Sequence, residues 1–227
     1  QLMVPFEYEG GVYGVPETMY FRGMFYRTDI MEELGLKVPE TWDEVFNDLI
    51  PALYENGMQF NIPNWLDTFL LTNGGSYYKT DENGHVQSAL DTPEAYEAFK
   101  MLTDAYVVYG VPTSANFLNR FRTGEMPIGL EGSPLYLQLI AAAPELNGRW
   151  AMAQVPGIRK EDGTVERHFA GYVGEAVTIL SGSEKVPEAF EFMKWWTSTE
   201  TQTTYGREVE SRIGSYARWL TSNMDAF

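Results

Sequence analysis

The chain has 227 residues and carries 16 Lys and Arg against 32 Asp and Glu, a formal net charge of −16. This balance argues against a nucleic-acid ligand and against an anionic membrane surface, because both need a basic protein surface. The sequence has no Cys and only two His, so it offers no disulfide, no thiolate metal site and no Cys nucleophile. We therefore expect neither a cofactor nor a bound metal. No apolar run reaches the roughly 20 residues that cross a bilayer.

The first part of the chain predicts extended structure. Residues 12–16 and 19–26 are rich in Val, Tyr, Phe and Met, and we place a turn between them near Glu17. Arg22 is unusual in such an apolar strand. Its guanidinium binds a carboxylate, of the protein or of a ligand, or it lies on the surface.

Two helices follow. The first spans about residues 28–34, and Gly35 can adopt the left-handed conformation that ends it. Thr41 and Glu44 have the spacing of a capping box and open the second helix, which Pro51 should kink or interrupt. One face of this helix is apolar and predicts a core: Trp42, Val45, Phe46, Leu49 and Leu53.

The middle of the chain predicts a short buried strand over 58–62 and a helix over 65–71 that ends at 73–75. Residues 81–84, Asp-Glu-Asn-Gly, predict the turn of a hairpin. A calcium loop would need further spaced carboxylates that this segment lacks. The helix opened by Thr92 carries a stripe that we assign to the core: Ala95, Phe99, Leu102, Tyr106 and Tyr109.

The remaining residues alternate helices and strands, which indicates an α/β fold with a largely parallel or mixed sheet. In chain order we expect a helix over 116–122, a strand over 128–131, a helix over 133–143, a strand over 150–155, a loop or hairpin over 157–167, a strand over 169–180, a helix over 186–196, a helix from 198 to about Gly206 and a last helix within 215–227. Trp42, Trp195 and Trp196 lie in amphipathic patterns, so we interpret them as core residues.

Several short motifs occur in an order typical of one protein family. They are Tyr-Gly-Val-Pro at 13–16, Phe-Tyr-Arg-Thr-Asp at 25–29, Pro-Glu-Thr-Trp-Asp-Glu at 39–44 and Lys-Val-Pro-Glu-Ala at 185–189. In this order they resemble the family 1 extracellular solute-binding proteins of ABC importers, over about residues 10–215. The chain departs from the family pattern at Arg27 and Thr28, at Pro127 and Ile128, and at the turn of 131–134, which lacks a Trp.

The resemblance implies a periplasmic-binding-protein-like (type II) fold, in which two α/β lobes, each a mixed sheet flanked by helices, face each other across a cleft. The chain would enter this pattern partway as an incomplete bilobed fold. Because it begins at Gln1 without a signal peptide, we expect a processed or trimmed fragment.

Three segments would divide this fragment. Residues 1–22 would be the hinge or crossover strand from the missing first lobe, and 23–170 the second, C-terminal lobe. Residues 171–227 would form the return hinge strand and the helices that normally pack on the first lobe. Without the first lobe, those helices would need another surface to pack against, such as a second copy of the chain in a homodimer.

The resemblance also implies a function. The protein would be the extracellular substrate-binding component of an ABC transporter, capturing a small solute and delivering it to the membrane permease. It would lie outside the cell or in the periplasm, with the full-length form anchored to the membrane as a lipoprotein. Relatives also carry iron, polyamines and phosphate esters. The 15% aromatic content and the lack of a basic cluster favour a neutral ligand, most simply a sugar or oligosaccharide.

Sugar sites combine aromatic faces, which stack on the ring, with polar groups that bind the hydroxyls. Carried over residue by residue, the resemblance gives these ligand-binding residues: Tyr20, Asn64, Trp65, Asp67, Glu131, Ser133, Tyr136, Gly171 and Tyr172. Trp65 is the aromatic most open to a ligand, since it begins a helix between two polar neighbours. Tyr20 and Tyr172 also fit ordinary packing in strands, where Tyr is common.

Two other functions remain open. A carbohydrate-active enzyme would need two carboxylates that face a scissile bond, and Glu131 and Glu175 are the candidates. The resemblance implies no chemistry, so we predict no catalytic residue. A ligand-sensing or interaction module without a transport role would predict no stabilisation by any sugar, because only a ligand that binds the native state raises its stability.

Overall fold

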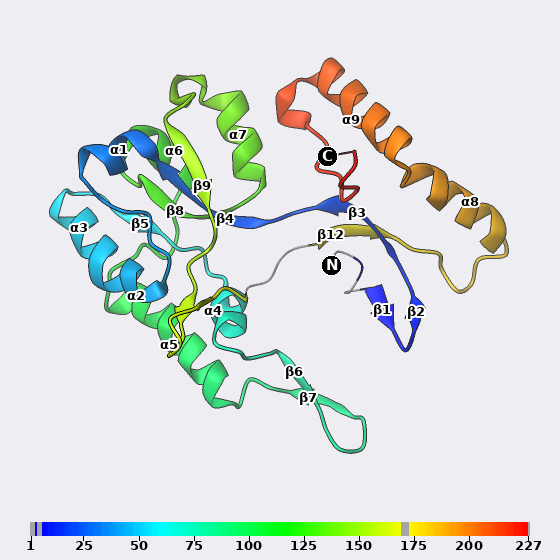
Figure 1. The fold of residues 1–227 in the computed structure, drawn as a ribbon, viewed down its shortest axis with the longest axis horizontal. Coiled ribbons are helices and arrows are strands. Elements are labelled where there is room, and N and C mark those ends of the chain that lie inside the picture. The colour runs from blue at the N-terminus through cyan, green and yellow to red at the C-terminus, as the bar shows by residue number, and fades with distance from the viewer. Residues whose placement is uncertain (1–2, 4–5, 169–172, 227) are drawn as a thin grey trace. The chain divides into compact units, whose positions relative to one another are not determined.

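Two compact units make up the chain in this computed structural model, which describes residues 3, 6–168 and 173–226 (Figure 1). Arg22–Gly132 and Ala143–Ala170 form one unit, here called the sheet unit. Gln1–Phe21, Ser133–Ala142 and Gly171–Phe227 form the other, here called the helix-pair unit. Each unit therefore combines segments that are distant in sequence.

A four-stranded mixed sheet with the order β5-β8-β4-β9 is the centre of the sheet unit. β4 (Arg22–Arg27) pairs antiparallel with both β8 (Ile128–Gly132) and β9 (Trp150–Ala153). β5 (Phe60–Asn61) runs parallel to β8. The prediction of a mixed sheet flanked by helices is confirmed.

The capping box at Thr41 is confirmed. The Thr41 hydroxyl accepts from the Glu44 amide, and the Glu44 carboxylate accepts from the Thr41 amide, at the start of α2 (Trp42–Glu44). α1 (Thr28–Glu33) ends before Gly35, which has a φ of 64°. The predicted interruption at Pro51 is a π-helical turn, η2 (Val45–Leu49), before α3 (Ile50–Glu55). A wider turn suits this position because proline lacks an N–H and crowds the carbonyl four residues earlier.

The core of the sheet unit is apolar and aromatic. Trp42 is 2% exposed, and its ring lies 5.8 Å from that of Phe46 and 4.5 Å from that of Phe69, centroid to centroid. The whole predicted face of the second helix is buried. α4 (Leu66–Thr72) and α5 (Pro93–Val107) also pack against each other.

The stripe predicted for α5 is partly wrong. Phe99 is 57% exposed, whereas the buried face carries Ala95, Ala98, Leu102 and Ala105. Three of these four are alanines, whose short side chains let α5 approach its neighbours closely. The larger Phe99 therefore points away from this contact.

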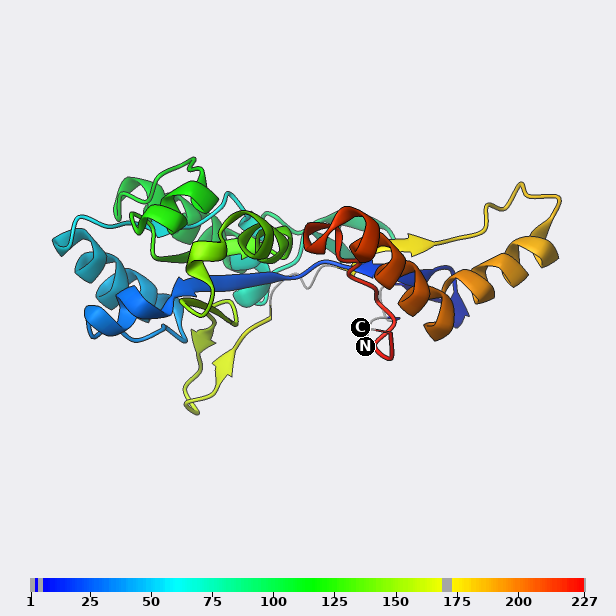
Figure 2. The same ribbon diagram turned by 90° about the horizontal axis from the view of Figure 1, so that it is seen from above.

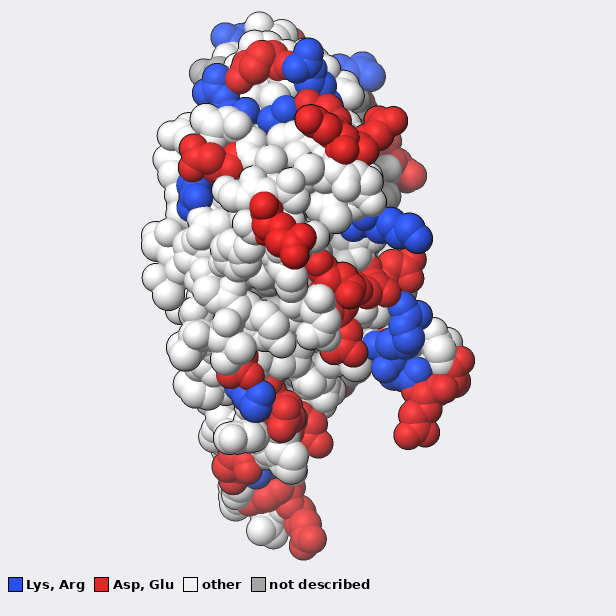
Figure 3. Space-filling model, turned by 90° about the vertical axis from the view of Figure 1, so that its left-hand side faces the viewer, with Lys and Arg blue, Asp and Glu red and all other residues white. Residues whose placement is uncertain are grey.

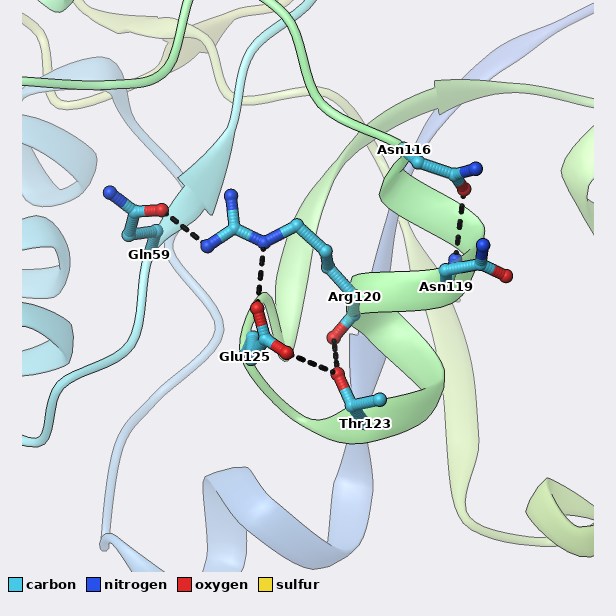
Figure 4. Close-up of polar contacts among 6 residues, drawn as sticks. All are labelled: Gln59, Asn116, Asn119, Arg120, Thr123 and Glu125. Atoms are coloured by element: carbon cyan, nitrogen blue, oxygen red, sulfur yellow. Dashed lines mark hydrogen bonds and ion pairs between the residues drawn. The ribbon is translucent and has the colours of Figure 1, made fainter.

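Polar side chains fix the ends of the elements around β5. α6 (Phe117–Thr123) begins at Asn116, whose side chain accepts from the Asn119 amide, and ends at Gly124, with a φ of 84°. Arg120 donates to the Glu125 carboxylate and to Gln59, the residue before β5 (Figure 4). These contacts tie α6 to the start of the strand that leads to Trp65.

Two hairpins extend from the sheet unit. β6 (Tyr78–Thr80) pairs with β7 (Val86–Ser88), and β10 (Ile158–Arg159) pairs with β11 (Val165–Glu166), both antiparallel. The hairpin predicted around 81–84 and the one left open for 157–167 are thus confirmed. A short 3-10 helix, η3 (Pro144–Leu146), precedes β9.

In the helix-pair unit, β3 (Val15–Met19) pairs antiparallel with β12 (Val173–Val177). Glu17 lies inside β3, so the turn predicted there is wrong, and the strand ends at Met19 instead. β1 (Glu7–Tyr8) and β2 (Gly11–Val12) form a small ribbon. α7 (Pro134–Ala142) packs against the 3-10 turn η4 (Ser215–Ala217).

The two long helices α8 (Val186–Trp196) and α9 (Thr199–Ile213) follow one another (Figure 2). α9 continues past Gly206, so the predicted end there is wrong. A Cβ added at Gly206 would lie 3.5 Å from the Trp219 side chain, in ordinary contact distance. The predicted last helix is also wrong beyond η4, because the tail bonds to β3 instead: Met19 donates to the Leu220 carbonyl and Ser222 to the Glu17 carbonyl.

The aromatic residues of this unit differ in burial. Trp196 lies near Tyr205 and Trp219, with centroids 5.0 and 6.3 Å away. Trp195 is 56% exposed, so its assignment to a core is wrong for the described residues. Phe190 and Phe192 are exposed as well, and Met193 is the one buried side chain of α8. Within the described part of the chain, most side chains of α8 are therefore exposed to solvent. No helix in that part is long and apolar enough to cross a membrane.

Candidate functional site

One edge of the mixed sheet gathers the ends of three strands. β5 and β8 are parallel, so their carboxyl ends reach the same edge, and β4 starts there because it is antiparallel to β8. Arg22, the first residue of β4, stands opposite Gly132, the last residue of β8. The chain leaves β5 at this edge and enters α4 at Trp65. Ligands of open α/β sheets bind outside the carboxyl ends of the strands.

Arg22 is the centre of this edge. Its Nη1 donates to Asp67 Oδ2 over 2.8 Å and to Thr68 Oγ1 over 3.1 Å. Its guanidinium carbon lies 4.2 Å from the centroid of the Trp65 ring, a cation–π distance. The Arg22 and Asp67 side chains are only 11% and 20% exposed. Of the alternatives for Arg22, a carboxylate of the protein is confirmed as its partner.

The two charges of this cluster compensate each other. The Asp67 carboxylate accepts from Arg22 with one oxygen and from the Thr68 amide with the other. Tyr77 lies close enough that the charge of Asp67 affects it. Burial raises the pKa of the Tyr77 hydroxyl and the Asp67 carboxylate adds to the rise, so this group is a protonated donor at neutral pH. The edge thus presents an aromatic ring, acceptors and donors without net charge.

Glu131 lies on the other face of the sheet. Side chains alternate between the two faces of a sheet, so Arg22 lies on the same face as Met24, which is part of the core. Glu131 pairs with Gly23, between these two residues, so its side chain points to the reverse face. Burial raises the pKa of the Glu131 carboxyl, and a hydrogen bond of 2.9 Å from the Gly132 amide lowers it by a smaller amount. The structure therefore does not bring Glu131 together with Trp65 and Asp67 on one face.

Asn64 is exposed beside Trp65, and Trp65 itself is half-buried. The other predicted residues belong to the helix-pair unit. Ser133 is buried, where its amide donates to the Phe21 carbonyl over 2.7 Å and its Oγ accepts from the Phe21 amide. Its hydroxyl thus holds the segment where the chain passes between the units.

Two tyrosines of the helix-pair unit have different settings. The Tyr20 ring, 37% exposed, lies against the backbone of Gly174, where any side chain would collide with it. Tyr136 is half-buried in the first turn of α7, and its amide donates to the Ser133 carbonyl. Gly171 and Tyr172 lie outside the described residues.

The sequence did not single out Tyr77 or Thr68. A charged residue in an apolar strand was the signal for Arg22, but nothing in the sequence paired it with Asp67, 45 residues away. Tyr77 lies in a Ser-Tyr-Tyr run that resembles many exposed loops. No group of His, Asp and Glu among the described residues is arranged to hold a metal ion.

Acidic side chains are spread over the surface. On the face drawn in Figure 3, Asp and Glu occur in several groups, with Lys and Arg beside some of them. Lys100 pairs with Asp104, Arg120 with Glu125 and Arg159 with Glu44, all in exposed positions. The face drawn in Figure 3 therefore offers no continuous basic footprint for a polyanion.

The sequence model of the bacterial extracellular solute-binding proteins matches residues 1–213. The chain belongs to this family. The predicted family is thereby confirmed, and the family is one of binding proteins that act outside the cytoplasm.

Curated solute-binding relatives match most of the chain at low identity. A lactose-binding protein of Rhizobium radiobacter is 23% identical over 194 residues, which are 82% of this chain and 45% of that protein. An arabinooligosaccharide-binding protein of Halalkalibacterium halodurans is 25% identical over 202 residues, 80% of this chain and 43% of that protein. The chain thus spans about half the length of the curated relatives it matches.

Solved structures of solute-binding proteins share the fold. The sugar-binding protein MalE of Xanthomonas citri aligns with a TM-score of 0.71 at 19% identity, covering 96% of this chain and 59% of that one. A solute-binding protein of Thermotoga lettingae, bound with α-D-tagatose, aligns with a TM-score of 0.64 at 20% identity, covering 94% and 57%. At these identities the likeness shows the fold alone, and it confirms the predicted type II class for a partial chain.

Proposed function

We propose that the protein is the solute-capturing component of an ABC importer and that its ligand is a neutral sugar or oligosaccharide. The observation that carries this proposal is the Arg22 cluster: a guanidinium 4.2 Å over the Trp65 ring and 2.8 Å from Asp67, at the ligand-binding edge of the sheet. The names of the relatives, which bind lactose and arabinooligosaccharides, support it.

Each group of the cluster has a role in this proposal. Trp65 is half-buried and offers the part of its ring that Arg22 leaves uncovered to the C–H face of a sugar ring, while Arg22 holds the indole in place. The Asp67 carboxylate is held by Arg22 and Thr68 and accepts from sugar hydroxyls with its remaining lone pairs. Tyr77 donates. Because Arg22 and Asp67 neutralise each other, a neutral polyol fits this edge better than an anionic sugar does.

The wider roles follow the family pattern. In this proposal residues 1–22 are the crossover strand, 23–170 the second lobe and 171–227 the return strand and the helices that face the first lobe. The full-length protein is extracellular or periplasmic, is anchored as a lipoprotein and delivers its ligand to a membrane permease. The 227-residue chain forms a homodimer through α8. Tyr20, Asn64, Tyr136, Gly171 and Tyr172 stay as predicted further contacts, whereas Glu131 lies on the reverse face of the sheet and Ser133 is buried, so neither is proposed as a contact of this ligand.

We propose binding without chemistry. Glu131 and Glu175 belong to different units, and the Glu175 side chain is exposed. Hydrolysis of a bound sugar by the purified full-length protein, lost in the Glu131→Gln variant, would contradict this part of the proposal. A module without a transport role would gain no stability from any sugar, and the thermal-shift screen described next tests for that gain.

The test is a thermal-shift and calorimetry screen of the full-length protein against lactose, maltose, galactobiose, tagatose and arabinose oligomers. A sugar that binds raises the melting temperature, since native-state binding adds RT ln(1 + [L]/Kd) to stability. Trp65→Ala should weaken that sugar by about 1 kcal/mol or more, roughly fivefold in Kd. Asp67→Asn, which keeps the shape but not the charge, should weaken it as well.

Trp195→Ala is the matched control, because it removes an exposed tryptophan that is not part of the cluster. It should leave the affinity within about twofold of the wild type. Melting of the ligand-free variants checks that each one folds. The proposal fails if no sugar of the panel shifts the melting temperature, and the site is wrong if Trp65→Ala binds as tightly as the wild type.

A further inference from the structure

A second apolar surface lies next to the Arg22 cluster. A groove of about 500 Å³ runs between the start of α4 and the first half of α5. Leu66, Leu90, Tyr96 and Phe99 line it, and Asp91 lies at its rim. This volume falls within the roughly 300–1,000 Å³ of ordinary ligand sites. The groove belongs to the sheet unit alone.

The groove exposes aromatic rings that the core does not use. Tyr96 and Phe99 are 66% and 57% exposed and stand three residues apart on α5, so they share one face of the helix. The helix packs through its alanine face instead. Scattered exposed apolar residues need no explanation, but several large ones in one groove mark a binding surface.

The groove continues the proposed sugar site. Leu66 is the first residue of α4, and Trp65, which lies under Arg22, directly precedes it. The lining of the groove therefore begins one residue after Trp65. The chemistry also matches: two aromatic faces stand beside the Asp91 carboxylate, which Lys79 holds over 2.8 Å and which keeps further acceptor positions for hydroxyls.

We propose that this groove is an extension subsite that binds the outer units of a neutral oligosaccharide. The inference rests on the proposed sugar site at Trp65 and Asp67 and deepens it. The ligand is then a chain of several sugar units rather than a monosaccharide, with Tyr96 and Phe99 as stacking platforms. Binding of an anionic chain is disfavoured, because the Asp91 carboxylate lines the groove and the whole protein carries a negative net charge.

The test compares short and long members of one sugar series on the full-length protein by calorimetry, with maltose against maltohexaose, lactose against longer galactosides, and arabinobiose against arabinohexaose. In the series that binds, the longer sugar should bind roughly tenfold more tightly, as two further aromatic contacts allow. Tyr96→Ala with Phe99→Ala should remove that gain and change the affinity for the short sugar less than about twofold. Tyr96→Phe, which keeps the ring, should retain most of the gain.

Val107→Ala is the control on the same helix, because Val107 is exposed but lies at the far end of α5. It should leave the gain unchanged. If short sugars bind and longer ones bind no better, or if the double variant keeps the gain, the groove is not a subsite while the proposed function stands. If no sugar of any length binds, the proposed function itself fails. If the double variant instead abolishes self-association in sedimentation, the groove is a contact between copies and the inference is overturned.

Discussion

Trp42 in the sheet unit stacks on Phe46, packs against the tilted ring of Phe69 and makes no hydrogen bond with its Nε1 among the described residues. Trp196 in the helix-pair unit donates its Nε1 to the Glu17 carboxylate and offers its carbonyl to Gln202. Gln202 in turn accepts from Trp219 Nε1 over 2.6 Å. Apolar contacts thus surround Trp42 in the sheet unit. In the helix-pair unit, by contrast, Gln202 links Trp196 and Trp219 by hydrogen bonds.

This difference indicates two kinds of sensitivity. Removing volume from the sheet unit leaves a cavity, whose cost grows with its size. Removing one partner from the network of the helix-pair unit leaves a buried donor or acceptor unsatisfied. The following substitutions test the contrast in unfolding experiments on the 227-residue chain, from the largest expected effect to the smallest.

Trp42→Ala should lower the free energy of unfolding by about 3–5 kcal/mol, the range for a large aromatic side chain removed from a core. Trp42→Phe should cost far less, about 1–2 kcal/mol, because most of the volume stays and the indole N–H has no partner to lose. Urea unfolding followed by circular dichroism measures both. Equal losses in the two variants would show that the indole N–H carries a contact and that the core is not purely apolar.

Gln202→Ala should lower the free energy of unfolding by about 2 kcal/mol, since it leaves Trp219 Nε1 and the Trp196 carbonyl without their partner. Gln202→Glu keeps an acceptor for Trp219 but loses the donor to Trp196, so it should fall between wild type and Gln202→Ala. The same urea titration applies. A loss below about 0.5 kcal/mol in Gln202→Ala, the size of an ordinary surface effect, would mean that water replaces the network.

Glu131→Gln should remove a pH dependence. Because burial raises the pKa of Glu131 above its ordinary 4.5, the folded state binds more protons than the unfolded state between these two values. The wild type therefore loses stability as the pH rises through this window. The glutamine variant should be more stable than wild type at pH 7, by less than about 1 kcal/mol after screening by water. Below the ordinary pKa of 4.5 the difference should vanish.

Thermal melts of both proteins from about pH 4 to pH 7 measure this difference across the window. The glutamine side chain keeps an acceptor for the Gly132 amide, so the comparison isolates the charge. Parallel curves for the two proteins over this range would show that Glu131 is solvated in the folded chain.

At concentrations where the proposed homodimer dissociates, Trp195→Ala should have the smallest effect on the 227-residue chain, within about 0.5 kcal/mol, because substitutions at exposed positions without a special contact change stability little. Repeating it in the full-length protein sharpens the comparison of the two units. A loss above about 2 kcal/mol there, but not in the 227-residue chain, would show that another part of the longer protein covers α8. A loss of that size in both would contradict its exposure.

Local signals predicted local structure well. The capping box at Thr41, the left-handed Gly35 and the hairpin turn at 81–84 all depend on residues within one or two turns. The motif order likewise predicted the family and the fold class. Two of the failures concern side chains whose neighbours had to be distant in sequence: Phe99 and Trp195 fit a core-facing pattern, yet each is more than half exposed in the described chain.

The sequence by itself determined the mixed α/β class and most helix boundaries, because these follow from spacing and side-chain chemistry. The order of its motifs identified the family, and the family resemblance proposed Trp65 and Asp67 as candidates. Tertiary structure alone decided that Arg22 pairs with Asp67 and lies over Trp65, that Tyr77 joins them, and that Glu131 points to the opposite face of the sheet. These facts depend on strand register and on contacts between distant segments, such as the pair of Arg22 and Asp67, 45 residues apart. Periodicity shows which residues share one face of a helix or strand, but only the packing of distant segments shows what that face contacts.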